Sequence, residues 1–252
     1  MNNNGLILHE DQDIAVIATG LNRDSENSKT GGMVQVYILY RHESPSEAIM
    51  SGNDSVICGD CIFRAQYDTN GAMIPGTRRC YVTIWQGPRS VWNCYRAGRY
   101  AYANGDYSAF AGRVVRWGAY GDPALIPLPI IRKVSAVAAG RTGYTHQWRV
   151  YPELRPYLMA SCDSIEDAID ATANGWRYFR VASKGETGIR RNEIVCPASA
   201  ESGKRTTCEN CRLCSGSRGR RETRKSVVIQ DHSSIAGTKP LIQIKGARVS
   251  GY

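Results

Sequence analysis

The chain lacks any long apolar stretch. Its best run, Leu125 to Ile131, is broken by Pro127 and Pro129, whereas a membrane-spanning helix needs about 20 consecutive apolar residues. The first residues, MNNNGLILHEDQD, lack the basic region and the apolar segment of a secretion signal. No internal repeat of fixed period is present. We therefore expect a soluble, cytoplasmic protein with no membrane partner.

Acidic residues are in the minority. The chain has 252 residues, with 32 Lys and Arg against 23 Asp and Glu, and a formal net charge of +9. Eleven basic and five acidic residues lie between Lys184 and Lys225, so this segment carries +6 of the total. The hydrophobic fraction of 42% and charged fraction of 22% are ordinary for globular proteins and exclude a disordered chain or a coiled coil. The basic excess favours a polyanionic partner such as nucleic acid.

Nine cysteines are present, and their odd number and the absence of an export signal argue against disulfides. The segment CPASAESGKRTTCENCRLC holds Cys208, Cys211 and Cys214 at two-residue spacings. Such spacing lets thiolates converge on one ion, and Cys196 or His232 can supply the fourth ligand. We predict a closed zinc site, with an iron–sulfur cluster as the alternative.

A second group of cysteines is less specific. Cys58 and Cys61 form one C-x2-C pair, and Cys80 follows. The spacing is compatible with a second zinc site, with a redox pair or with neither. If the group binds metal, the fourth ligand is open, with Cys94, His42 and an outside ligand as candidates.

Alternating strands and helices predict an α/β fold with parallel strands. We expect a trimmed or irregular (β/α) barrel, with an open doubly wound sheet as the rival, in one domain over residues 1–252. This domain contains a metal-pinned, Cys-rich insert at about 51–107 and a basic metal-binding element at about 190–232. Strands are predicted at 34–39, 113–118, 143–148, 157–162, 176–182, 193–196 and 226–231, and helices at 128–139 and 164–175.

The helix at 164–175 has the clearest signals. Ser164 and Asp167 can form a capping box, and Gly175 supplies the stop. Four residues share one helical face: Ile165, Ala168, Ile169 and Thr172.

Several predicted strands end in a polar residue, where parallel α/β folds carry their chemistry. These residues are Asp122, His146, Asp163, Asp231 and His232. Asp163 is a candidate nucleophile or acid/base, although Asp before a helix is also an ordinary N-cap; Ser164 can take over that capping. Asp122 precedes a proline, as capping residues do, and His146 is either an acid/base or a core histidine.

Aromatic and basic residues alternate between Trp85 and Tyr107. Bases stack on aromatic rings and arginines hold phosphates, so this pattern favours nucleic-acid binding; a core-facing stripe of Trp92, Tyr95 and Arg99 is the alternative. The residues expected to contact nucleic acid are Arg89, Trp92, Arg96, Arg99, Arg218, Arg220 and Arg221.

Two segments resemble a known family. YLMASCDSIEDAIDATANGWRYFRVA resembles the late strand–helix–strand segment of tRNA-guanine transglycosylases, which a zinc site follows, and KTGGMVQVYIL resembles their Gly-Gly-Phe-Gln-Val segment. The order KTGG, CGDC, GAYGDP, YTHQW and CENCRLCSG also resembles short phage proteins of the DpdA type. This resemblance implies exchange of guanine in DNA for a free 7-deazaguanine base, which protects phage DNA from restriction. The DNA would be double-stranded or locally unpaired, and the enzyme would work in the host cytoplasm.

The chain departs from that family at both main catalytic carboxylates. Arg180 stands at the apparent nucleophile position, and Lys29-Thr30 replaces Asp-Ser before the glycine pair. We therefore assign attack to Asp163 and base recognition or proton transfer to Asp122, with His146 assisting. Two other classes of function compete: a non-catalytic, zinc-stabilised DNA-binding or host-defence-inhibiting protein, and a redox or iron–sulfur enzyme.

Overall fold

The computed structural model describes residues 4–22, 24–25, 27–183, 186 and 189–231. Its strands are β1 (Gly5–Glu10), β2 (Ile14–Thr19), β3 (Val34–Tyr40), β4 (Ala101–Tyr102), β5 (Val114–Tyr120), β6 (Gly140–Thr142), β7 (Tyr144–Thr145), β8 (Met159–Cys162), β9 (Tyr178–Ala182), β10 (Glu193–Val195) and β11 (Ser226–Gln230). Its α-helices are α1 (Pro45–Ser51), α2 (Ser55–Cys58), α3 (Gly87–Arg96), α4 (Leu128–Val137), α5 (Ile165–Ala173) and α6 (Cys208–Cys211). Short 3-10 turns cover 108–110, 123–125, 146–149, 152–154, 200–202 and 219–221.

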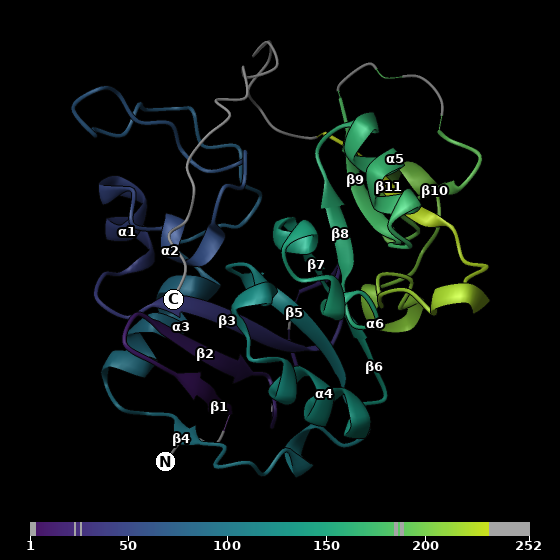
Figure 1. Ribbon diagram of the computed structural model, residues 1–252. Coiled ribbons are helices and arrows are strands. Elements are labelled where there is room, and N and C mark those ends of the chain that lie inside the picture. Colours follow the sequence, from purple (N-terminus) through teal and green to yellow (C-terminus); the bar gives the residue numbers. More distant parts are fainter. Residues whose placement is uncertain (1–3, 23, 26, 184–185, 187–188, 232–252) are drawn as a thin grey trace.

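The described strands form two sheets (Figure 1). One has the order β4-β1-β2-β3-β5-β6 and the other β10-β11-β9-β8-β7. β1, β2 and β3 pair in antiparallel fashion, whereas β3-β5-β6 and all of the second sheet are parallel. The predicted α/β class is therefore confirmed.

The predicted barrel is not closed in the part of the chain that the structure describes. The parallel series continues beyond β3 into the antiparallel hairpin of β1 and β2, and it ends on the other side at β10. Beyond this hairpin the first sheet ends at β4, which pairs with β1. β4 and β10 are edge strands of different sheets and do not pair with each other.

A single glycine joins the two sheets. Gly143 lies between β6 and β7, donates its amide to Cys214 O (3.0 Å) and accepts from Met159 N (2.9 Å). A Cβ at this position would come within 2.8 Å of Trp117 and 2.7 Å of Leu158. Only a residue without a side chain lets the chain pass from one sheet to the other here.

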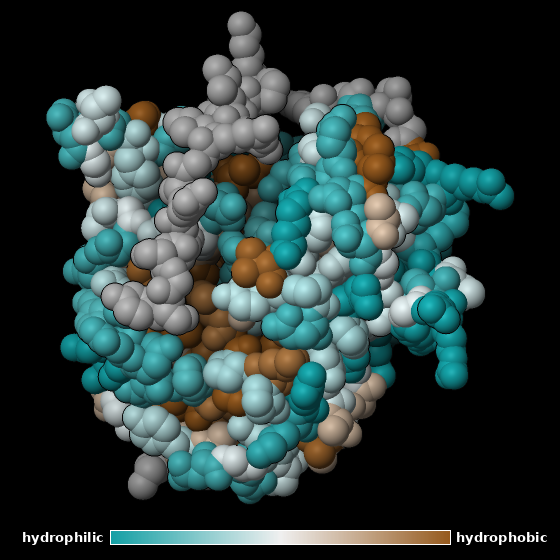
Figure 2. Space-filling model, in the orientation of Figure 1, coloured by the Kyte–Doolittle hydropathy of each residue, from teal (hydrophilic) through white to brown (hydrophobic). Residues whose placement is uncertain are grey.

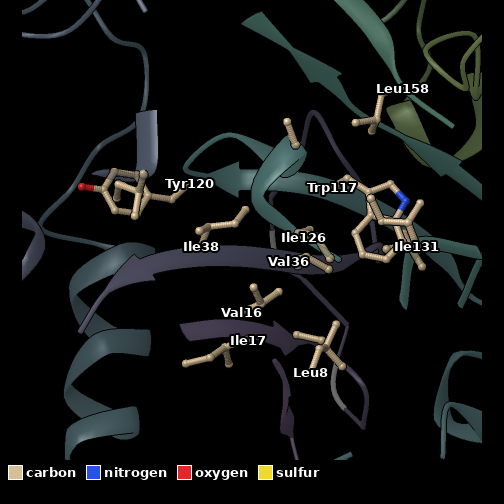
Figure 3. Close-up of a cluster of buried hydrophobic side chains, with 14 of the residues drawn as sticks. Leu8, Val16, Ile17, Val36, Ile38, Trp117, Tyr120, Ile126, Ile131 and Leu158 are labelled. Atoms are coloured by element: carbon tan, nitrogen blue, oxygen red, sulfur yellow. The ribbon is translucent and has the colours of Figure 1, made fainter. Parts of the chain in front are cut away.

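The main hydrophobic core lies on β2, β3 and β5. Val16, Ile17, Val36 and Ile38 are fully buried, and in Figure 3 Val36 and Ile38 lie on the side of β3 that carries side chains from β5 and α4, whereas Ile17 points to the other side of β2. A fully buried side chain of this size contributes about 1.5–3 kcal/mol. On the face seen in Figure 2, hydrophobic residues gather toward the middle and hydrophilic side chains surround them.

Helix α5 packs against β8 and β9, as the strand–helix–strand pattern predicted, but its buried face differs from the face noted in the sequence. Ala168 and Ala171 have no exposed surface, whereas Ile165 is 42% and Ile169 51% exposed. The buried side of the helix is therefore formed by small alanine side chains. Of the residues that share a face in the sequence pattern, the two isoleucines are not part of the buried surface.

Candidate functional site

The carboxyl ends of the parallel strands bring together the polar residues that follow them. Asp122 follows β5, His146 follows β7, Asp163 follows β8 and Asp231 follows β11. β7, β8 and β11 belong to one parallel sheet, in which β7 and β8 are neighbours, so their carboxyl ends share one edge. β5 lies in the other sheet, and Asp122 is connected to this edge by hydrogen bonds from Thr145 and His146. Hydrogen bonds join three of the four residues directly: Asp122 to His146, and His146 to Asp163.

Asp122 is buried and its carboxylate is fully engaged. Oδ1 accepts from Ala124 N (2.9 Å) and Thr145 Oγ1 (2.6 Å), and Oδ2 accepts from His146 N (2.9 Å). Its own amide donates to Ile57 O at 2.7 Å. Asp122 thus caps the 123–125 turn and fixes the end of β7, which places His146.

His146 and Asp163 form a hydrogen-bonded pair. Nε2 of His146 lies 3.3 Å from Oδ1 of Asp163, and the two side chains are 21% and 16% exposed. Burial lowers the pKa of His146, but hydrogen bonds and charges from Asp163 and Cys61 outweigh burial and raise this pKa well above its usual value.

The carboxylate of Asp163 is not used for capping. Ser164 is the N-cap of α5, and its Oγ accepts from Asp167 N at 3.0 Å. Asp167 Oδ2 in turn accepts from Asp163 N at 3.1 Å. The hydroxyl predicted to replace Asp163 as the cap does so, which leaves the Asp163 carboxylate to His146.

The insert supplies further side chains to this edge. The ring of Phe63 lies 6.3 Å from those of His146 and Tyr81, and the Arg79 guanidinium lies 5.5 Å from the Phe63 ring. Arg79 Nη2 (2.6 Å) and Tyr81 Oη (2.9 Å) both donate to Asp231. Sequence reasoning noted Asp231 as a strand end but did not identify Phe63, Arg79 or Tyr81.

The first cysteine group lies beside His146. Cys61 is hydrogen-bonded to His146, and Cys80 is within electrostatic reach of both. Burial raises the pKa of Cys58 well above its usual value, and the charges of Cys61 and Cys80 add to that rise. The three thiols therefore lie near one another at the strand ends.

The second cysteine group is held between the two sheets. Cys196 N donates to Val228 O (2.8 Å), Cys208 N to Lys29 O (2.9 Å), and Gly143 N to Cys214 O (3.0 Å). Burial raises the pKa of Cys214, and the charges of Cys196, Cys208 and Cys211 raise it further, so the four thiols lie within electrostatic reach. His232, the alternative ligand, lies outside the described residues.

Within the described ranges, no three His, Cys, Asp or Glu side chains are already arranged as ligands of one metal ion. The predicted metal centres therefore stay predictions. What the structure shows is two groups of thiols at separate positions, one beside the strand ends and one at the junction of the sheets.

The arginines expected to contact nucleic acid are all exposed: Arg89, Arg96, Arg99, Arg218, Arg220 and Arg221. The first three lie on or just after α3, which packs on α1 and β3. Trp92 is half-buried, and the Arg96 guanidinium lies 5.7 Å from its ring. The other three belong to the segment around the 219–221 turn, so the two sets come from different parts of the fold.

Arg180 forms a buried ion pair. Its Nε and Nη2 donate to Glu193 at 2.9 and 3.1 Å, and Nη1 donates to Glu186 at 3.0 Å. The side chains of Arg180 and Glu193 are 2% and 0% exposed, and the pair spans β11 to connect β9 with β10. Arg180 therefore makes a structural contact within the second sheet.

No family model, no curated protein and no solved structure matches the chain. In the part that the structure describes, no helix has the length and apolar character needed to cross a membrane.

Proposed function

We propose that this protein is a DNA base-modifying transglycosylase that exchanges guanine for a free 7-deazaguanine base. The observation that carries the proposal is the Asp163–His146 pair at the carboxyl edge of the parallel strands, at 3.3 Å, with Phe63, Arg79 and Tyr81 around it. We interpret the arc of parallel strands as an open form of the predicted barrel, whose C-terminal edge carries the chemistry.

In the proposed reaction, Asp163 is the nucleophile. Its carboxylate attacks C1′ of the deoxyguanosine, the C1′–N9 bond breaks, and the bonding electrons leave with guanine. His146 assists by holding Oδ1 of Asp163 in position. The departing base takes up a proton from the hydrogen-bonded pair Tyr81–Asp231, which recovers it from N9 of the incoming base as that base displaces Asp163 from C1′.

Asp122 has a positioning role in this scheme. Both of its oxygens are already occupied by Ala124, Thr145 and His146, and its side chain is buried. It fixes the backbone of His146, and the contacts that Asp231 makes fit proton transfer better than those of Asp122.

The basic surface would hold the DNA. A guanine must leave the helix stack to reach a carboxylate at the strand ends, which costs a few kcal/mol. The half-exposed ring of Tyr81 offers a stacking surface for it, and exposed arginines near α3 and the 219–221 turn can bind the phosphates.

A zinc ion bound by Cys196, Cys208, Cys211 and Cys214 would be structural. The four thiols lie within electrostatic reach of one another, and four thiolates are a donor set that zinc uses in closed sites. Such an ion would fasten β10 and the α6 segment to the junction of the sheets. An iron–sulfur cluster is the alternative, because such clusters are also held by four cysteine thiolates.

The test is transfer of labelled 7-deazaguanine into guanine-containing duplex DNA. We expect the parent chain to label the DNA and Asp163→Asn to lose activity while it keeps its DNA affinity. The matched control is Asp170→Asn, because Asp170 is an exposed partner of Arg149 on the same helix and should retain activity. Absence of label with folded parent protein would contradict the proposal, and full activity in Asp163→Asn would contradict the assignment of the nucleophile.

A further inference from the structure

Three thiols of the insert and one imidazole from the sheet lie at the same place. Cys61 N donates to Cys58 O at 3.3 Å, and Cys80 N donates to Phe63 O at 2.9 Å. The Phe63 ring lies 6.3 Å from that of His146, and His146 is hydrogen-bonded to Cys61. The backbone of the insert therefore brings the C-x2-C pair and the distant Cys80 to His146.

Among the described residues, the guanidinium groups whose charges act on these sulfurs are hydrogen-bonded to oxygen atoms. The nearest guanidinium groups belong to Arg64 and Arg78. Arg64 donates to Asp54 Oδ1 (2.6 Å), and Arg78 donates to carbonyl oxygens, among them Cys80 O at 3.2 Å. A cluster of partly buried thiols with these neighbours is a favourable environment for a soft divalent cation.

The structure also chooses among the candidates for the fourth ligand. His42 is engaged elsewhere, with Nε2 3.0 Å from Gln12 O and 3.4 Å from Asp13 Oδ1. Cys94 is hydrogen-bonded to Tyr100. His146 is the imidazole beside the three thiols, and the carboxylate of Asp163 lies against it at 3.3 Å.

We propose that Cys58, Cys61, Cys80 and His146 bind one zinc ion and that Asp163 orients the imidazole from the outside. Three thiolates and one imidazole form a common tetrahedral zinc site, and a ligating histidine usually donates its other N–H to a carboxylate. In the described residues these side chains do not yet surround one point as ligands, so the ion is bound as they rotate toward one another.

The ion would clamp the insert onto the strand ends. Phe63 and Cys80 are joined by backbone hydrogen bonding, so a site at Cys80 also fixes Phe63, Arg79 and Tyr81 beside Asp163. This inference does not depend on base exchange. The bond to His146 engages Oδ1 of Asp163 and not Oδ2, so the attack proposed for Asp163 can use the second oxygen.

The experiment measures zinc content of the purified full chain and of three variants. We expect Cys80→Ser and His146→Ala each to lose about one zinc ion per chain relative to the parent. The matched control Cys94→Ser should lose none, because Cys94 lies on α3 and its side chain is hydrogen-bonded to Tyr100. Equal zinc content in the parent and in Cys80→Ser would overturn the inference, as would iron in place of zinc.

A measurement on the unaltered chain covers the case in which a variant fails to fold. After removal of metal, iodoacetamide labelling of each cysteine is followed by mass spectrometry with and without added zinc. Zinc should slow alkylation of Cys58, Cys61 and Cys80 together and leave Cys94 unchanged. If zinc protects only the cysteines between 196 and 214, the inference fails while the base-exchange proposal stands, because that proposal is tested on DNA.

Discussion

The two aspartates that follow β5 and β8 differ in what their carboxylates contact. Asp122 accepts hydrogen bonds at both oxygens, whereas Asp163 contacts His146 through Oδ1. The sequence presents both as Asp at a strand end before a turn or helix. The difference arises from Ser164, which caps α5 and has no counterpart after Asp122, where Pro123 follows. A capping residue next in sequence thus leaves the Asp163 carboxylate to His146, whereas Asp122 has to cap its own turn.

The sequence predicts only in part which side chains come together at the strand ends. His146 and Asp163 end neighbouring parallel strands, and the rule for parallel sheets places them on one edge. Arg79 and Tyr81 reach Asp231 from an insert about 150 residues away in sequence. No local periodicity encodes the path of that insert, so its contribution to the site could not be foreseen.

At the level of a single carboxylate, Glu222 gives a prediction of pH dependence. Burial raises its pKa, but hydrogen bonds from the Arg224 side chain and from the amides of Arg218 and Arg224 outweigh burial and lower the pKa from 4.5 to about 2. A carboxyl with a lowered folded pKa adds stability above its unfolded pKa of 4.5 and loses this contribution as the pH falls toward the folded value.

We therefore expect Glu222→Gln to be less stable than the parent at about pH 6 and to approach the parent between about pH 4.5 and 2. Urea unfolding of both proteins across this range measures the difference in their free energies of unfolding. The other titrating groups are the same in both proteins, so their contributions cancel in this difference. A difference that stays constant with pH would contradict this account of Glu222.

Among the elements, α5 carries the sharpest contrast between pattern and structure. The buried positions are Ala168 and Ala171, and the larger Ile169 is half exposed. We expect Ala168→Leu to destabilise the fold by about 1–3 kcal/mol because a larger side chain has no room between helix and sheet. Ile169→Ala should change stability by no more than about 0.5 kcal/mol. Denaturant unfolding of both variants measures the two free energies of unfolding. A larger loss of stability in Ile169→Ala than in Ala168→Leu would contradict the buried alanine face and favour a buried isoleucine face.

The elements that the sequence predicts well are those with strong periodicity and clear ends. The strands at β3, β5, β8, β9, β10 and β11 and the helices α4 and α5 are confirmed to within a few residues. The hairpin of β1 and β2 was not predicted. Its turn contains neither Gly nor Pro and relies on Asp11, whose Oδ1 accepts from Asp13 N and Ile14 N at 2.9 and 2.8 Å. Such a side-chain turn gives little signal in composition.

At the scale of the molecule, the fold depends on how two sheets join within six residues of chain. β6 pairs with β5 in the first sheet and β7 pairs with β8 in the second, so the chain passes from one sheet to the other at Gly143. The second cysteine group meets this junction, since Cys214 O accepts from Gly143 N. A change at the junction should therefore affect both sheets and the cysteine segment together.

Gly143→Ala tests this dependence. The added methyl group would meet Leu158 Cδ2 at 2.7 Å and Trp117 Cβ at 2.8 Å, and Trp117 is almost completely buried, so neither neighbour can withdraw freely. We expect a loss of about 1–3 kcal/mol in the free energy of unfolding. Gly140→Ala is the matched control three residues earlier, because its new Cβ would meet the flexible side chain of Arg212 at 2.9 Å, which can move aside. Equal stability of the two variants would show that the passage at Gly143 has room for a side chain, and the two sheets would then have to be joined by other contacts.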